Sequence, residues 1–218
     1  MAYNTFAPTV YKDMTLCLDS FNLKSYDNIS SDWYDLSGRS NNALLYNSPL
    51  FDVVLSFDGV NDYGIIPYNS DFDLTGDFTL ESYFSPNAFV GIIISSDAYG
   101  SSFDWCIYLA NDSQISIYSN GTGTNVTADI PQMIVGDWYH CIITSNAGLI
   151  SIYVDGILYI SEMMSISNSN TDITVGCAGF NNPNSFFSGR ISTVKVYKTS
   201  FTSEQVQQNY SVLKNRFK

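Results

Sequence analysis

Residues 55–86 constrain the fold of this chain more than any other stretch. Two short apolar runs, residues 55–57 and 63–66, lie on either side of the acidic turn DGVND, whose Gly59 and Asn61 tolerate the left-handed backbone of a tight hairpin. Residues 78–84 then alternate between two sets of side chains, which is typical of a half-buried β-strand. The sets are Phe78, Leu80, Ser82 and Phe84 on one face and Thr79, Glu81 and Tyr83 on the other. These patterns predict a β scaffold with an acidic turn.

Short strands separated by turn residues continue along most of the chain, and about twelve are expected in all. The period changes to helical spacing at residues 202–217. A capping-box pair opens this segment, and apolar positions follow it: Thr202 and Gln205, then Val206, Tyr210, Leu213 and Phe217. The sequence therefore predicts an all-β fold, a two-sheet antiparallel sandwich closed by a short C-terminal helix. We expect one domain at residues 14–218, preceded by an arm at residues 1–13 that becomes ordered against a partner.

Charge and hydropathy exclude two classes of partner. The chain has 21 acidic and 9 basic residues and a formal net charge of −12, so it repels phosphate backbones and nucleic acid is not expected to bind. No apolar run approaches the roughly 18 residues that a membrane-spanning helix needs. Neither nucleic acid nor a membrane is therefore an expected partner.

Four cysteines stand far apart, each beside apolar residues, without the C-x-x-C spacing of a metal or redox site: Cys17, Cys106, Cys141 and Cys177. They are interpreted as small buried hydrophobic residues, with a disulfide as the alternative. The N-terminus has neither a basic segment nor an apolar segment of a secretory signal, which indicates synthesis in a reducing cytoplasm.

Catalysis is not expected from these residues. A retaining glycosidase needs two carboxylates about 5 Å apart, but Glu81 has no Asp or Glu two residues away on its own strand face. His140 is the only histidine and no G-x-S-x-G motif accompanies it, so a Ser-His-Asp set is not indicated either. His140 is interpreted as a half-buried strand residue.

Asp and Asn side chains in turns are candidate calcium ligands, because Ca²⁺ prefers carboxylate, amide and carbonyl oxygens. The proposed set is Asp35, Asp58, Asn61 and Asp62, with Asn42 assisting. The alternative is that the carboxylates cap their own turns through bonds to the backbone. The only candidate cofactor is thus Ca²⁺.

Loops that combine aromatic and amide side chains are candidate carbohydrate sites, since sugars stack on aromatic rings and hydrogen-bond to amides. The candidates are Tyr99, Phe103, Phe180, Asn181, Asn182 and Asn184. With 16 Tyr and 14 Phe in the chain, aromatic side chains near Asn also arise by chance. Carbohydrate binding is therefore one of several open hypotheses.

Several motifs occur in an order that resembles the laminin-G-like branch of the concanavalin A-like lectin/glucanase superfamily. They are FDGVNDY and DFTLESYFSP at residues 57–86, WYDLSG at 33–38, GDWYH at 136–140 with YVDG at 153–156, and FSGRI at 187–191 with VY at 196–197. The resemblance covers residues 14–213 and implies a jelly-roll sandwich. It also implies a calcium site at the sandwich rim, although Arg39 and Ala43 depart from the family's pattern.

The opening and closing segments of the domain further resemble laminin-G-like domains in structural proteins of tailed bacteriophages and large DNA viruses. This resemblance implies a non-enzymatic virion surface protein, such as a capsid decoration, head fibre or tail-associated module. Its partners would be other virion proteins, contacted through the N-terminal arm, and surface glycans, with a homo-oligomer as an open alternative. The competing hypotheses are a calcium-dependent lectin or adhesin and, less favoured, a glycoside hydrolase.

Overall fold

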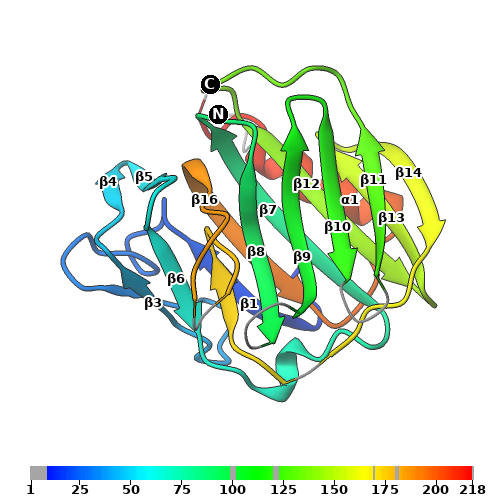
Figure 1. Cartoon of the computed structure of the whole chain (residues 1–218), viewed down its shortest axis with the longest axis horizontal. Coiled ribbons are helices and arrows are strands. Elements are labelled where there is room, and N and C mark those ends of the chain that lie inside the picture. The colour runs from blue at the N-terminus through cyan, green and yellow to red at the C-terminus, as the bar shows by residue number, and fades with distance from the viewer. Residues whose placement is uncertain (1–8, 99–101, 120–122, 169, 180–181, 218) are drawn as a thin grey trace, which may run out of the picture.

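Two antiparallel β-sheets packed face to face form the molecule, and one helix covers the outside of one of them (Figure 1). The computed structural model describes residues 9–98, 102–119, 123–168, 170–179 and 182–217. Sheet A contains, in spatial order, β14 (Ile157–Met163), β13 (Leu149–Val154), β12 (Tyr139–Asn146), β7 (Phe78–Pro86), β16 (Ser188–Tyr197), β5 (Val54–Asp58) and β4 (Leu50–Asp52), while β1 (Met14–Asp19) also pairs with β16.

Sheet B forms the second layer. Its spatial order is β11 (Thr124–Asp129), β10 (Gln114–Ser119), β9 (Ser102–Asn111), β8 (Gly91–Ala98), β15 (Ile173–Val175), β6 (Tyr63–Ile66), β3 (Ala43–Tyr46) and β2 (Asp32–Trp33). A 3₁₀ turn, η1 (Ser70–Phe72), connects β6 to β7. The main core lies between the sheets and includes the fully buried Trp33, Phe84 and Trp105. All four cysteines are buried and none of them forms a disulfide, as predicted.

The acidic turn does not make the predicted hairpin. β5 belongs to sheet A and β6 belongs to sheet B, so residues 58–62 carry the chain from one layer to the other. Gly59 has the predicted left-handed backbone, with φ of +78°, whereas Asn61 does not have a positive φ. The two strands take different neighbours: β5 pairs with β16, and β6 pairs with β15 and β3. Turn residues specify that the chain reverses and do not specify which strands then pair.

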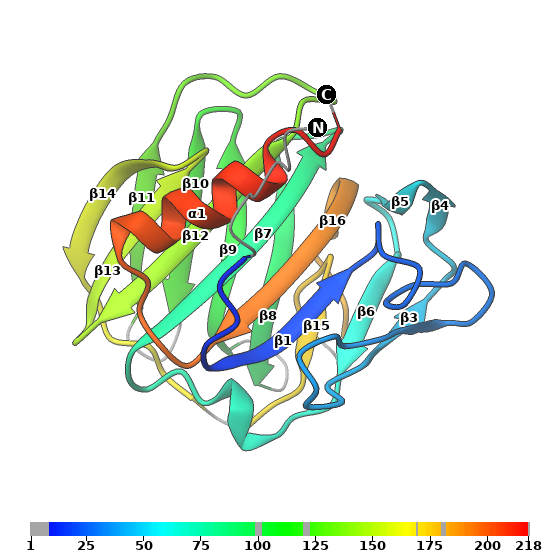
Figure 2. The same cartoon turned by 180° about the vertical axis from the view of Figure 1, so that it is seen from behind.

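The strand predicted to be half-buried is buried at every position. All nine residues of β7 are buried, because α1 (Ser203–Leu213) lies across the outer face of sheet A (Figure 2). A smaller apolar cluster that includes Tyr197, Phe201 and Val206 fills the space between helix and sheet. Glu81, expected on a solvent-facing side, is therefore only 1% exposed.

The C-terminal helix begins as predicted and ends earlier. Thr202 caps α1, and the capping box with Gln205 is complete. The helix ends at Leu213, so Phe217 lies beyond it, whereas the sequence predicted helix to residue 217. At the other terminus, Val10 packs in the cluster beneath α1. The last part of the predicted arm therefore lies against the domain itself.

Candidate functional site

The turn at residues 58–62 is closed by its own carboxylates. Oδ1 of Asp58 accepts hydrogen bonds from the backbone N–H groups of Val60, Asn61 and Asp62, at 2.7, 3.0 and 3.3 Å. Oδ2 of Asp62 accepts one from the backbone N–H of Asp58 at 3.0 Å. Burial acts to raise the pKa of Asp58, but the backbone donors outweigh it and hold that pKa below its usual value. Three of the predicted calcium ligands thus lie together, with Asp58 engaged by the main chain.

Asp35, the fourth predicted ligand, organises a different loop. Its Oδ1 accepts from the backbone N–H groups of Cys17 and Ser37, both at 2.8 Å, and its Oδ2 accepts from that of Asn41 at 3.0 Å. Asn42 accepts from the backbone N–H of Asp35 at 2.9 Å. Among the described residues, no group of three or more His, Cys, Asp or Glu side chains could hold a metal ion. These bonds match the turn-capping alternative, and calcium stays a prediction.

The loops predicted to bind carbohydrate belong to opposite ends of β8. The loop with Asn182 and Asn184 lies beside the start of β8, where the Ile92 N–H donates to the Ser185 carbonyl at 3.0 Å. Phe103 lies near the start of β9, where it pairs with Asp97 close to the far end of β8. Tyr99, Phe180, Asn181 and the Phe103 side chain lie outside the described residues. Asn182 and Asn184 are both exposed.

A pocket with a volume of about 310 Å³ lies on the outer face of sheet B, next to the Asn182–Asn184 loop. Tyr108 of β9 and Tyr118 of β10 form its aromatic wall, and it is called the tyrosine pocket below. In the register of these strands Tyr108 lies opposite Ser116 and Tyr118 opposite Cys106, so both rings leave the sheet on the same side. The remaining lining is Val90, Gly91, Ile92, Cys106, Leu109 and Ser185.

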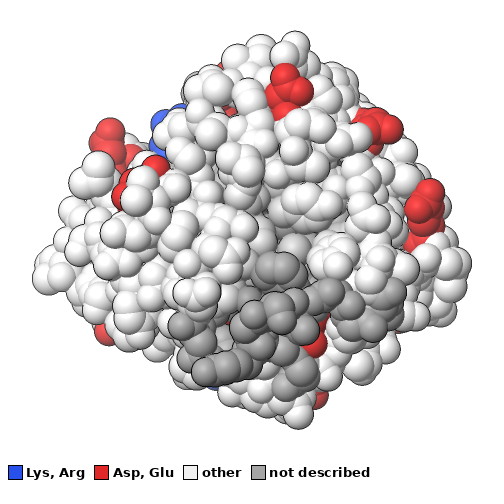
Figure 3. Space-filling model, viewed as in Figure 1, with Lys and Arg blue, Asp and Glu red and all other residues white. Residues whose placement is uncertain are grey.

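The surface around the tyrosine pocket carries little charge. Figure 3 shows this face with its acidic side chains at the margins and uncharged side chains over the middle of the described surface. The lining of the pocket contains no charged residue. A chain with a net charge of −12 therefore presents a face suited to a neutral ligand.

Sequence reasoning placed the aromatic side chains in loops and missed the two on strands. The signal was present: Ile107 and Leu109 are core residues, and so is Ile117. Period-two alternation then puts the intervening Tyr108 and the following Tyr118 on the outer face. The sequence pattern did not show which sheet the helix covers, and the structure places α1 on sheet A.

Glu81 is the centre of a buried polar cluster between sheet A and α1. Its Oε1 accepts from His140 Nε2 at 3.0 Å and from Lys195 Nζ at 3.2 Å. Its Oε2 accepts from the hydroxyl of Tyr197 at 3.0 Å and from Asn209 Nδ2 at 2.7 Å. Burial alone would raise the pKa of Glu81, but the Lys195 charge and the hydrogen bonds from His140 and Asn209 hold it far below its usual value. The carboxylate is therefore ionised and fully engaged.

His140 belongs to the same cluster. The sequence predicted a half-buried residue, but the His140 side chain is buried and only 1% exposed. It points under α1, where its ring stacks with that of Tyr210 at a centroid distance of 5.9 Å. Its Nδ1 has no hydrogen-bond partner in the described part of the chain. Neither Glu81 nor His140 reaches a surface where a substrate could meet it.

The comparisons with known proteins place the chain in a family. Residues 58–207 match the family model described as the concanavalin A-like lectin/glucanases superfamily (Laminin_G_3). The chain belongs to this family. No curated protein matches the sequence.

Solved structures share the fold at low identity. A Trypanosoma rangeli sialidase in complex with sialic acid is similar with a TM-score of 0.71 and 14% identity, over 93% of this chain and 33% of the sialidase chain. The botulinum neurotoxin serotype D binding domain is similar with a TM-score of 0.72 and 14% identity, over 93% of this chain and 52% of that domain. The chain thus spans a third to a half of these proteins, and both an enzyme and a binding domain contain the fold.

None of the helices in the described residues is long and apolar enough to cross a membrane.

Proposed function

We propose that this chain is a non-enzymatic carbohydrate-binding domain that holds a neutral saccharide in the tyrosine pocket. The observation that carries the proposal is the pair of partly exposed rings, Tyr108 and Tyr118, in a pocket whose described lining has no charged residue. The C–H face of a pyranose ring is apolar and packs on such rings, while its hydroxyl groups need polar partners at the edge of the pocket. The exposed Asn182 and Asn184 lie in the loop beside that edge.

The geometry of Glu81 and His140 supports the non-enzymatic part of the proposal. A general acid or base must come within hydrogen-bond reach of the substrate. Both side chains are buried, and each contacts a residue of α1: Glu81 contacts Asn209, and His140 contacts Tyr210. The described lining of the tyrosine pocket contains no Asp, Glu or His, so this pocket suits binding better than hydrolysis.

The setting we propose is the surface of a viral particle. It is supported by the resemblance of the opening and closing segments of the domain to laminin-G-like domains of bacteriophage structural proteins. Residues before Val10 would contact capsid or fibre proteins, because Val10 itself is occupied by the domain: its backbone N–H donates to Asn209 Oδ1 at 2.8 Å. The chain would be made in the host cytoplasm and act outside it, on the particle.

The test of the carbohydrate proposal is a screen of neutral and acidic glycans followed by calorimetry on the hits. We expect Tyr108→Ala and Tyr118→Ala to weaken binding of a neutral glycan at least about tenfold, the scale expected for one aromatic contact. Tyr34→Ala, on an exposed ring outside the pocket lining, is the matched control and should bind as the parent chain does. Equal losses in all three variants, or no neutral hit, would contradict the proposal.

The particle setting has a separate test. Deleting residues 1–8 removes the proposed attachment segment and keeps Val10 with its bond to Asn209. This deletion should release the chain from purified particles and leave glycan binding unchanged. Full retention on particles would exclude attachment through the arm without affecting the carbohydrate proposal.

A further inference from the structure

A second, larger pocket lies on the opposite side of the molecule, at the outer face of sheet A. Its volume is about 620 Å³, and it lies where the β4–β5 turn, the start of β12 and the segment after α1 meet. Trp138, Phe217 and Tyr83 supply aromatic walls, and it is called the Trp138 pocket below. It shares no lining residue with the tyrosine pocket, so the two are separate sites.

The aromatic walls form one packed cluster. The rings of Trp138 and Phe217 stack with centroids 4.1 Å apart, and that of Tyr83 lies 5.1 Å from Trp138 and 5.8 Å from Phe217. Tyr83 is buried, whereas Trp138 and Phe217 are partly exposed and reach the pocket. The walls are therefore formed before any ligand arrives.

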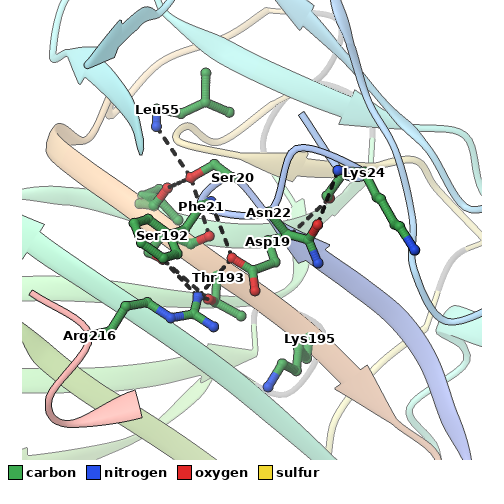
Figure 4. Close-up of polar contacts among 12 residues, drawn as sticks. Asp19, Ser20, Phe21, Asn22, Lys24, Leu55, Ser192, Thr193, Lys195 and Arg216 are labelled. Carbon is green, nitrogen blue, oxygen red and sulfur yellow. Dashed lines mark hydrogen bonds and ion pairs between the residues drawn. The ribbon is translucent and has the colours of Figure 1, made fainter. Parts of the chain in front are cut away.

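Arg216, the residue before Phe217, is bound to the end of β1 and to β16 (Figure 4). Arg216 Nη1 donates to Oδ1 of Asp19 at 2.7 Å and to the hydroxyl groups of Ser192 and Thr193, both at 3.3 Å. The guanidinium also lies 5.3 Å from the ring centroid of Phe21, which packs edge-on against Phe217. The segment after α1 is thus a fixed wall of the pocket.

The charged groups around the Trp138 pocket are unbalanced. Asp52, Asp137 and Asp155 line it together with a single cation, Arg190, which leaves an excess of two negative charges. Within the described residues, neither the Asp52 nor the Asp137 carboxylate forms a hydrogen bond or an ion pair. Burial and then the Asp155 charge raise the pKa of Tyr83 to about 12, which agrees with an electronegative site.

Arg190 does not neutralise this excess by pairing with a carboxylate. Its Nη2 donates to the Ser85 hydroxyl at 2.9 Å and to the Gly136 carbonyl at 3.0 Å. Its guanidinium lies 5.1 Å from the centroid of the Trp138 ring. The pocket therefore already contains one cation in contact with its aromatic wall.

We propose that the Trp138 pocket binds a ligand through an ammonium group. Aromatic rings attract a cation through their negative faces, and two unpaired carboxylates supply the opposite charge. An anionic group would meet a net negative charge and is disfavoured. The proposal does not depend on the carbohydrate proposal, because it rests on different residues and on the opposite face.

Calorimetry with two probes of equal shape tests the proposal. Choline carries a quaternary ammonium, and 3,3-dimethylbutan-1-ol is its uncharged isostere. We expect choline to bind saturably and the isostere at least about tenfold more weakly, with choline binding weakened by salt. Equal affinities, or no saturable heat with choline, would overturn the proposal.

Tryptophan fluorescence reports the site. Trp33 and Trp105 are 0% and 1% exposed, whereas Trp138 is partly exposed in the pocket. Choline should change the emission of the parent chain, and Trp138→Phe, which keeps an aromatic wall, should remove that change. An emission change that persists in this variant would place the binding elsewhere.

Paired charge variants complete the test. Asp52→Asn/Asp137→Asn should weaken choline binding about tenfold or more. Asp32→Asn/Asp129→Asn changes the net charge equally, at residues outside the pocket, and should leave binding unchanged. Equal losses in both variants would show attraction to the acidic chain as a whole and would overturn the assignment to this site. Thermal unfolding of each variant verifies that it is folded.

Discussion

Asn209 of α1 donates a hydrogen bond from Nδ2 to Oε2 of Glu81 in β7, at 2.7 Å and across 128 residues of sequence. Its Oδ1 accepts from the backbone N–H of Val10 at 2.8 Å. One fully buried side chain thereby joins the helix, the centre of sheet A and the N-terminal segment. Because a buried polar group must be paired, this contact fixes where the helix lies on the sheet more narrowly than apolar packing does.

Removing the Glu81 charge should destabilise the fold severely. Glu81 and Lys195 lie directly opposite each other in β7 and β16, and both are buried. In Glu81→Gln the Lys195 ammonium stays buried without its counter-charge, and breaking such a pair costs about 3–5 kcal/mol. Urea denaturation at pH 7 measures the loss. A loss of unfolding free energy below about 1 kcal/mol, as for an exposed ion pair, would contradict the conclusion that Glu81 and Lys195 form a buried ion pair.

The double variant Glu81→Leu/Lys195→Met is the matched control for that experiment. It removes both charges and leaves neither buried alone, so it should be more stable than Glu81→Gln. If the double variant is instead the less stable of the two, hydrogen bonds to His140, Tyr197 and Asn209 dominate the cluster.

Acid should weaken the fold through the same carboxylate. The pKa of Glu81 is lowered in the folded chain relative to 4.5, its ordinary value, so folding favours the ionised form. The stabilisation is fully present above about pH 4.5 and is lost progressively as the pH falls below that value. Each such group contributes a slope of at most about 1.36 kcal/mol per pH unit. Unfolding free energies between pH 7 and pH 3 measure it.

Three other carboxylates have pKa values that backbone or side-chain hydrogen-bond donors lower: Asp27, Asp58 and Glu204. They also contribute to the loss of unfolding free energy at acid pH. The unfolding free energy of Glu81→Gln should fall less steeply with decreasing pH than that of the parent chain. If this pH dependence is unchanged in the variant, the acid sensitivity comes from the other carboxylates and not from Glu81.

Asp58→Ala should lower stability by about 1–2 kcal/mol, since three backbone N–H groups lose their acceptor. Asp58→Asn keeps one side-chain oxygen and should lose less. Thermal unfolding of all three chains, with EDTA and with excess Ca²⁺, measures the effect. A midpoint that rises with Ca²⁺ only when Asp58 is present would support the calcium site predicted from the sequence.

Gly59→Ala should be more damaging than Gly38→Ala. Both glycines have left-handed backbones, with φ of +78° and +86°, so each substitution costs about 1–2 kcal/mol from conformation alone. A Cβ at Gly59 would also lie 2.7 Å from Cβ of Ser188, whereas one at Gly38 meets nothing within 4 Å. Urea denaturation should therefore show an additional loss at Gly59 alone. Equal losses would mean that Ser188 moves aside at little cost.

Several features of the fold could be predicted because their signals are local. The capping box of Thr202 and Gln205, for example, depends on a spacing of three residues within one segment. The burial of the four cysteines could be predicted from their apolar neighbours. The family motifs are likewise short and ordered along the chain.

The candidate sites depended on contacts that are distant in sequence. The Trp138 pocket combines Asp52, Trp138, Arg190 and Phe217, and no local pattern links them. The predicted carbohydrate residues Phe103 and Asn184 lie near opposite ends of β8. The composition of a loop does not determine its position in the fold, which depends on the direction and register of the strands that it connects.

The sequence by itself thus determined the elements: alternating strands, turns that reverse the chain, and one capped helix, since each depends on the conformational preferences of neighbouring residues. The tertiary structure alone decided that β5 and β6 enter different sheets and that α1 covers sheet A. It also decided that Glu81 is buried and that Tyr108 and Tyr118 are partly exposed in a pocket of sheet B. The physical reason is that alternation specifies two faces for each strand, whereas the partner that buries a face comes from a distant part of the chain.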